Sequence, residues 1–310
     1  MSWKPVVVGV DPSPESVVAA NAGWGIAQAA GVRCHLVHAT RDVRSSLVMG
    51  MSPMSAEEVQ AKLVDIVERQ ITGALKDKIP AGALAALEFR IDKAPEALAQ
   101  AVKDYDAGLV VAGGKHHSVL GRWLGGSSAL NAARTLDVPL LVTAGGAPPY
   151  RRILVAVDLS YAARPAIDEA KRLAALFGAA VRAVHVVEPV PIVPEVPSLV
   201  DTGEFAALSR ERLEQDIWPL LGGEVERSVA HGVAAEAIAR EAREWKADLV
   251  VVGSHGKGWW DRLMIGSVTE RLLNHLPTSL LVVPVPAPQL PEAAPVKRGA
   301  WKLRRVVTPV

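Results

Sequence analysis

Short runs of apolar, β-branched residues alternate with longer stretches of helical spacing along most of the chain. In the second half, residues 153–157 (ILVAV) are continuously apolar, which is typical of a parallel strand buried on both faces. Asp158 and Ser160 then offer caps for a helix that stops at Gly178. The same alternation predicts further strands at 181–187, 225–229, 249–252 and 279–283, and helices within 188–221 and at 234–245 and 268–275.

An internal repeat gives this alternation twice. The segment that begins at Ala107 aligns without gaps with the segment that begins at Ala247, at a constant offset of 140 residues. Near the start of each half, the segment VVVGVDPS with Asp11 resembles the segment ILVAVDLS with Asp158. Two copies of one domain are the simplest explanation. In the first copy we expect strands at 6–10, 33–37, 87–91, 109–111 and 140–142, and helices at 16–30, 56–75 and 95–105.

Strands that alternate with helices predict an α/β fold with a Rossmann-like sheet in each copy. Right-handed crossovers build a parallel sheet that helices cover on both faces, and such sheets bind ligands beyond the carboxyl ends of their strands. The Gly- and Pro-rich segment AGGAPPY at 144–150 predicts a linker. We therefore expect one domain at 1–146, a second at 150–285 and a basic tail at 286–310.

Composition and charge exclude several classes of protein. The net charge is +1, which gives no indication of a nucleic-acid partner, although the tail holds five basic residues against one acid, Glu292. No apolar run reaches the length of a transmembrane helix and no signal sequence opens the chain, so we expect a cytoplasmic protein without a membrane partner. The single cysteine, Cys34, cannot form an internal disulfide and is expected to be a small buried residue.

The segment Leu249–Thr269 (LVVVGSHGKGWWDRLMIGSVT) carries the clearest chemical signal. Gly253, Gly256, Gly266 and Ser267 follow the spacing G-x2-G-x9-G-S between a buried strand and a helix. Glycines let backbone N–H groups approach a phosphate closely, and the start of a helix adds free N–H groups and the positive end of its dipole. Neither the Walker sequence G-x4-G-K-[ST] nor a G-x-G-x-x-G after the first strand occurs. The spacing therefore predicts a phosphate-binding loop outside the P-loop and dinucleotide classes.

These features resemble the universal stress protein family in its tandem form, over essentially residues 4–285. The family's nucleotide-binding motif, G-2x-G-9x-G-[S/T], is complete in the second copy. The resemblance implies five parallel strands per domain and ATP or a related adenine nucleotide at the ends of the first and fourth strands, with magnesium able to accompany the phosphates. It also implies a stress-response regulator whose two domains pack with pseudo-twofold symmetry and whose whole chain can form a homodimer. The residues implied to bind, from base and ribose to phosphates, are Asp158, Val186, Val252, Gly253, His255, Gly256, Gly266, Ser267, Val268 and Thr269.

The first copy departs from this motif. His116 stands where the second glycine belongs, and its side chain can either block the phosphates or place a titratable donor on them. Asp11 is also followed by Pro12. We favour a degenerate loop, while the presence of Asp11 leaves a weak second site open. The residues of that second site would be Asp11, Gly113, Gly126 and Ser127.

Two other functions stay open. A slow ATPase would use Lys257 and Arg262 to steady charge on the phosphates, but no carboxylate stands beside His255 to orient it as a base, so a packing or donor role is preferred for His255. A binding module without nucleotide would recruit an unidentified protein partner through Trp259, Trp260 and the basic tail. His116 and His117 stand side by side in the glycine loop of the first copy, and without a nearby Cys or acidic ligand they are a poor metal-ligand set. We predict neither a metal site nor a catalytic residue.

Overall fold

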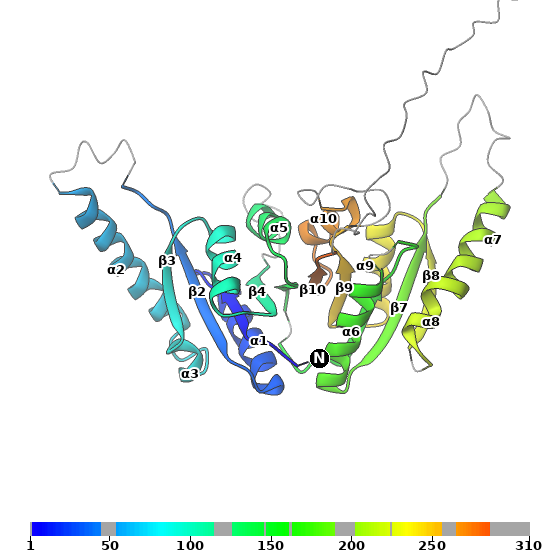
Figure 1. Ribbon diagram of the computed structural model, residues 1–310, viewed down its shortest axis with the longest axis horizontal. Helices are drawn as coiled ribbons and strands as arrows, with labels where there is room; N and C mark the ends of the chain where they lie inside the picture. The colour runs from blue at the N-terminus through cyan, green and yellow to red at the C-terminus, as the bar shows by residue number, and fades with distance from the viewer. Residues whose placement is uncertain are drawn as a thin grey trace, which may run out of the picture.

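The computed structural model of the chain describes residues 2–44, 54–114, 126–145, 147–160, 163–189, 202–223, 225–255 and 265–285. Strands alternate with helices in both halves, and the strands form a mostly parallel sheet flanked by helices (Figure 1). The predicted α/β fold with two repeated five-stranded parallel units is therefore confirmed. Several residues singled out above lie outside the described part of the chain: Gly256, Lys257, Trp259, Trp260, Arg262, His116, His117 and the basic tail.

The elements follow the predicted alternation, and every expected strand and helix is present with bounds that shift by a few residues. None of the helices in the described part of the chain has the length and apolar character that crossing a bilayer requires. The first half contains β1 (Val6–Gly9), α1 (Pro14–Ala30), β2 (Cys34–Thr40), α2 (Ala56–Leu75), α3 (Ala81–Leu84), β3 (Leu87–Ile91), α4 (Ala94–Asp104), β4 (Leu109–Gly113), α5 (Gly126–Thr135) and β5 (Leu140–Thr143). The second half contains β6 (Arg152–Ala156), α6 (Ala163–Phe177), β7 (Ala180–Val187), α7 (Thr202–Arg212), the π-helical turn η2 (Leu213–Ile217), α8 (Trp218–Leu221), β8 (Glu226–His231), α9 (Ala234–Glu244), β9 (Leu249–Gly253), α10 (Ser267–Asn274) and β10 (Ser279–Val283).

Local sequence signals set the ends of the helices. α1 carries Pro14 in its first turn, where the missing N–H of proline has no helical acceptor to lose. α2 begins with a capping box: the Ser55 hydroxyl accepts from the backbone N–H of Glu58, and the Glu58 carboxylate accepts from the backbone N–H of Ser55. α6 stops at Gly178, whose φ of 65° is left-handed, as predicted.

Three local features differ from the expectation. α3 and α5 lie where no helix is predicted, although α5 is the repeat of α10 and follows β4 as α10 follows β9. In the helical part of 188–221, the wide turn η2 interrupts the α-helix just before Pro219. Proline has no N–H to donate to the preceding turn, so a wider turn accommodates the missing hydrogen bond.

The ten strands form one sheet in the order β3-β2-β1-β4-β5-β10-β9-β6-β7-β8. Within each half the neighbouring strands are parallel, and the order reverses between β1 and β4 and between β6 and β9. The halves join where β5 and β10 pair antiparallel, with Leu281 opposite Leu141. Figure 1 shows this join at the centre of the molecule, with α5 and α10 side by side above it. The sequence analysis does not predict this pairing, which replaces two free sheet edges with one continuous ladder.

Both faces of the sheet are buried, as the continuously apolar strands predict. Ile153 packs on the face that α1 and α6 cover, whereas Leu154 packs on the face that α4, α9 and α10 cover. Cys34 is buried on the first of these faces, and burial raises the pKa of its thiol to about 12. The thiol is therefore protonated at neutral pH, which agrees with the expected structural role.

Polar and aromatic contacts reinforce the join between the halves. The backbone N–H of Ala144 donates to Ser279 Oγ at 3.2 Å, beside the β5–β10 ladder. The guanidinium of Arg172 on α6 lies over the ring of Trp3 at 3.8 Å from its centroid. The two halves are thus held by a strand ladder and by contacts on either side of it.

Leu281→Ala is expected to lower the free energy of unfolding by roughly 2–5 kcal/mol, because it empties a buried position at the join. The matched control Leu208→Ala removes the same atoms from an exposed site on α7, and a change below about 0.5 kcal/mol is expected. Urea unfolding followed by circular dichroism measures both variants. Equal losses in the two would contradict the assigned core.

Candidate functional site

A cavity of about 390 Å³ opens at the carboxyl ends of β6, β7 and β9, beside the starts of α9 and α10. Parallel sheets bind ligands at this place, because the crossovers on either side of a reversal in strand order leave in opposite directions. Every residue predicted to bind nucleotide that the structure describes, from Asp158 to Thr269, lines this cavity. Gly256 lies outside the described residues.

Asp158 lies two residues after the end of β6, and a short turn fixes its carboxylate at the cavity. Asp158 Oδ1 accepts from the backbone N–H of Ser160 at 3.0 Å and from the Ser160 hydroxyl at 2.5 Å. Aspartate commonly makes this turn, since its side chain reaches the backbone two residues further on. An ionised carboxylate has more acceptor positions than these two bonds use, so Asp158 can still accept from a ligand.

The start of α10 supplies backbone donors on the other side of the cavity. The first helical bond runs from the N–H of Glu270 to the carbonyl of Gly266, so the N–H groups of Ser267, Val268 and Thr269 have no acceptor within the helix. The N-cap residue, Gly266, has no side chain to cap this end of α10, and no side chain among the described residues is seen to bond to it. Gly266 has extended angles, φ −61° and ψ 142°, which any residue adopts. The backbone conformation of Gly266 therefore does not require glycine, and the residue lines the cavity.

Thr269 holds α10 in place with its side chain. Its hydroxyl donates to the carbonyl of Gly253 at 2.8 Å, and the residue is buried. The resemblance includes Thr269 among the nucleotide-binding residues, and in the structure its hydroxyl ties the helix to the end of β9. The backbone N–H of Gly266 makes a second tie by donating to the carbonyl of Ser254 at 2.9 Å.

His255 lines the cavity as a neutral donor. Its Nδ1 lies 2.9 Å from the hydroxyl of Ser254, which itself accepts from the backbone N–H of Val285 at 3.2 Å. When the Ser254 hydroxyl donates to Nδ1, the proton of the neutral ring resides on Nε2. His255 Nε2 is buried and has no hydrogen-bond partner among the described residues. Burial lowers the pKa of His255 below its ordinary value, so the ring is uncharged at neutral pH.

The end of β7 and the start of α9 form the third wall, which the sequence analysis recognised only through Val186. His185 lines the cavity too, with Nδ1 2.9 Å from the carbonyl of Val157, and so joins the ends of β6 and β7. Glu188 Oε1 accepts from the backbone N–H of Ala234 at 2.9 Å, at the first residue of α9. The signal that could have found Glu188 is its position, since it follows the second strand of the copy.

The first half repeats the frame of this site. Asp11 follows β1, and its Oδ1 accepts from the backbone N–H of Ser13 at 2.9 Å and from the Ser16 hydroxyl at 2.7 Å. His38 Nδ1 lies 2.7 Å from the carbonyl of Val10, as His185 lies beside Val157 in the second half. The strand ends that carry Asp11 and Gly113 are adjacent, because β1 pairs with β4.

The side chains that complete the site differ in the first half. A Cβ placed at Gly113 would lie 2.9 Å from the backbone of Glu15, so the first turn of α1 closes on the end of β4. Ala129 stands where Thr269 ties α10 to β9, so the corresponding tie cannot form. α5 begins at Gly126, as its repeat α10 begins after Gly266, while the side chain of Ser127 lies outside the described part of the structure. The tie that Thr269 makes is therefore a feature of the second half and not of the repeat.

Comparisons with known proteins agree on one family. A family model described as the universal stress protein family matches residues 2–144 and again residues 149–284. A universal stress protein of Mycolicibacterium smegmatis is 30% identical over 292 residues, which cover 90% of this chain and 96% of that protein. One of Mycobacterium tuberculosis is 29% identical over 290 residues, which cover 87% and 93%. The crystal structure of a universal stress protein from Archaeoglobus fulgidus has a TM-score of 0.63 at 17% identity, covers 92% of this chain and 99% of its own, and shows the same fold.

His255 is expected to titrate below about 6.5, the ordinary value for histidine, because burial disfavours its charged form. The unfolded chain then binds a proton that the folded ring does not, so stability falls as the pH drops from about 6.5 towards the lowered pKa of the folded state. NMR titration of the ligand-free protein measures the pKa, and the His255→Gln variant assigns the resonance. His255→Gln should also lack this part of the acid destabilisation. Titration above 6.5 would contradict the buried position.

Proposed function

We propose an adenine-nucleotide-binding function for this chain, which belongs to the universal stress protein family. The family resemblance seen in the loop motif is confirmed, and it places the chain among proteins of the stress response. The observation that carries the proposal is that the uncapped start of α10 and the ends of β6 and β7 line one cavity. One side of this cavity suits phosphates and the other suits a base.

The phosphates are proposed to lie at the start of α10. The N–H groups of Ser267 and Val268 are free of helical acceptors there, and the helix dipole adds positive potential. His255 Nε2 provides a further buried donor on the β9 side of the cavity. The backbone N–H groups and the His255 ring are all uncharged donors. The phosphates are therefore proposed to be held by hydrogen bonds and not by the Walker lysine that a P-loop uses.

The adenine is proposed to lie against β7, at Val186. The β6–β7 register ends at Val184, whose carbonyl accepts from the backbone N–H of Val157. Alternate residues of a strand direct their backbone groups to the same neighbour, so the N–H and C=O of Val186 face the side that β6 has left. A donor and an acceptor in that arrangement match N1 and the N6 amino group of adenine. Ile238 adds an apolar wall.

A regulatory role follows if the nucleotide binds one conformation more tightly than another. α10, which would hold the phosphates, packs against α5 of the first half (Figure 1). Phosphate binding at α10 is therefore placed to affect the join between the halves, and through it assembly with a partner protein or with a second copy of the chain. Magnesium is proposed only as a companion of the phosphates, since no group of three or more His, Cys, Asp or Glu side chains in the described part of the chain could hold a metal ion.

Slow hydrolysis and a partner-binding module without nucleotide are the alternatives. Hydrolysis finds no specific support in the described residues: His255 Nδ1 is engaged with Ser254, and the cations proposed to assist, Lys257 and Arg262, lie outside them. A turnover assay with magnesium or manganese tests hydrolysis directly. An empty cavity in protein isolated from cells, together with no calorimetric signal on addition of ATP, would favour the partner-binding module.

Gly266→Val is expected to weaken ATP binding at least about tenfold, because the added side chain would stand in the cavity in front of the α10 N–H groups. The extended backbone at Gly266 accepts valine without strain, so the variant should fold. The matched control is Gly126→Val at the equivalent place in the first half, for which ATP affinity within about twofold of wild type is expected. Isothermal titration calorimetry measures all three proteins.

Two results of this comparison would count against the proposal. Unchanged ATP affinity in Gly266→Val would remove the phosphates from α10. A larger loss in Gly126→Val than in Gly266→Val would move the nucleotide to the first half. Mass spectrometry of small molecules extracted from the purified wild-type protein gives an independent check, and an adenine nucleotide is expected among them.

A further inference from the structure

Two helices begin at the cavity of the second half, and each has one glutamate in its first turn, Glu236 in α9 and Glu270 in α10, but a carboxylate from outside the helix is bonded to only one of them. The backbone N–H of Ala234, at the start of α9, donates to Glu188 Oε1 at 2.9 Å. The start of α10 has no side-chain cap. The Glu188 carboxylate thus occupies the first N–H of α9, while the first N–H groups of α10 have no helical acceptor. An anionic group that enters the cavity therefore meets backbone donors at α10 and the negative charge of Glu188 at α9.

We propose that Glu188 determines which ribose this site accepts. Its carboxylate takes a hydrogen bond from a free ribose hydroxyl and repels a phosphate carried on the ribose. Glu188 Oε1 is engaged by Ala234, and an ionised carboxylate offers about four acceptor positions, so others remain for the ligand. This inference rests on the proposed function, because it assumes a nucleotide with its phosphates at α10.

The strand order places Glu188 near the ribose of the proposed nucleotide. Along the sheet the order is β9, β6, β7, so a nucleotide with its phosphates beside β9 reaches past Asp158 towards β7. Glu188 follows Val186, the proposed adenine contact, by two residues, or roughly 6–7 Å along an extended chain. In doubly wound sheets an acidic residue at the end of the second strand bonds ribose hydroxyls, whereas an arginine there accommodates a ribose phosphate.

The first half contains the opposite charge at the equivalent position. Thr40 lies beside Ile91 in the β2–β3 ladder, as Val187 lies beside His231 in the β7–β8 ladder. The next residue after the second strand is therefore Arg41 in the first half, where the second half has Glu188. The chain itself thus provides both members of the acid–arginine pair on one duplicated frame.

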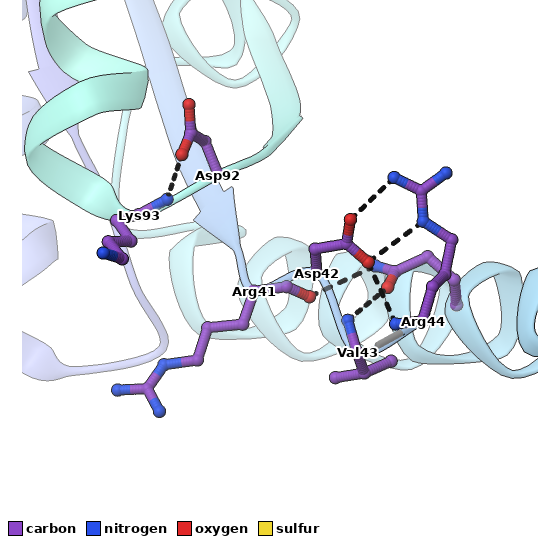
Figure 2. A network of polar contacts seen from close by, with 7 residues as sticks. Arg41, Asp42, Val43, Arg44, Asp92 and Lys93 are labelled. Atoms are coloured by element: carbon purple, nitrogen blue, oxygen red, sulfur yellow. Dashed lines mark hydrogen bonds and ion pairs between the residues drawn. The ribbon is translucent and has the colours of Figure 1, made fainter. Parts of the chain in front are cut away.

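Figure 2 shows the corresponding region of the first half. The counterpart of Ala234 there is Ala94, the first residue of α4, whereas Asp92 Oδ1 accepts from the backbone N–H of Lys93, one residue earlier. The Arg41 side chain extends away from the bonded pair Asp42–Arg44, and only its backbone carbonyl enters that network, by accepting from Gln60. The carboxylate cap on α9 is accordingly a feature of the second half and not of the repeat.

The experiment compares 5′-AMP with two ligands that differ from it only by an added phosphate on the ribose. The dissociation constants of 5′-AMP and of adenosine 2′,5′- and 3′,5′-bisphosphate are measured by calorimetry on the full chain. In the wild type AMP is expected to bind about tenfold more tightly than either bisphosphate. Glu188→Gln keeps the acceptor for the Ala234 N–H but removes the charge, and the ratio should fall towards one. Glu188→Arg, which copies the first half, should favour at least one bisphosphate.

The control is Glu236→Gln, which removes a charge from the first turn of α9 at an exposed residue. Its ratio should match that of the wild type, whereas a merely stabilising role of Glu188 would change all affinities and leave the ratio unchanged. AMP binding with equal ratios in wild type and Glu188→Gln would overturn the inference alone. No binding of AMP or ATP to the wild type would overturn the proposed function and the inference with it.

Discussion

The parallel pairing of β6 with β9, where the strand order reverses, is the constraint on which the candidate site depends. Ile153 lies beside Leu249 and Val155 beside Val251, so both strands end at the same edge of the sheet. Crossovers on the two sides of this point leave in opposite directions, and a cavity results between them. The ties from Thr269 and Gly266 then bring the start of α10 back to the end of β9. This packing sets the backbone N–H groups at the start of α10 beside the cavity.

The second constraint is the antiparallel ladder between β5 and β10, which makes one sheet from two repeats. It sets α5 beside α10 and so connects the candidate phosphate site to the other half of the chain. The repeats share a frame, including the histidine that joins the ends of the first two strands. They differ in the residues that finish the site, since Glu188 and Thr269 have Arg41 and Ala129 as their counterparts. The two copies thus share one architecture but differ in the side chains at the ends of their strands.

Much of the fold could be predicted from the sequence, because a strand such as 153–157 is apolar on both faces and a glycine such as Gly178 stops a helix. The position of Asp158 beside Gly253 also followed, since parallel strands with crossovers bring their carboxyl ends to one edge. The β5–β10 pairing did not follow, because two apolar edge strands do not specify their partner. The roles of Thr269 and Glu188 were missed for a related reason: each bonds to a residue on another element, Gly253 and Ala234, whose approach depends on packing. The type of a residue does not show which distant backbone group its side chain will bond.

The stoichiometry of nucleotide binding tests the assignment of the site to the second half most directly. Titration of the ligand-free chain with ATP is expected to saturate at one nucleotide per chain, because the tie that Thr269 makes to the end of β9 cannot form at Ala129 of the first half. Saturation at two nucleotides with similar affinity would contradict the asymmetry between the halves. No binding at any accessible concentration would contradict the nucleotide site itself.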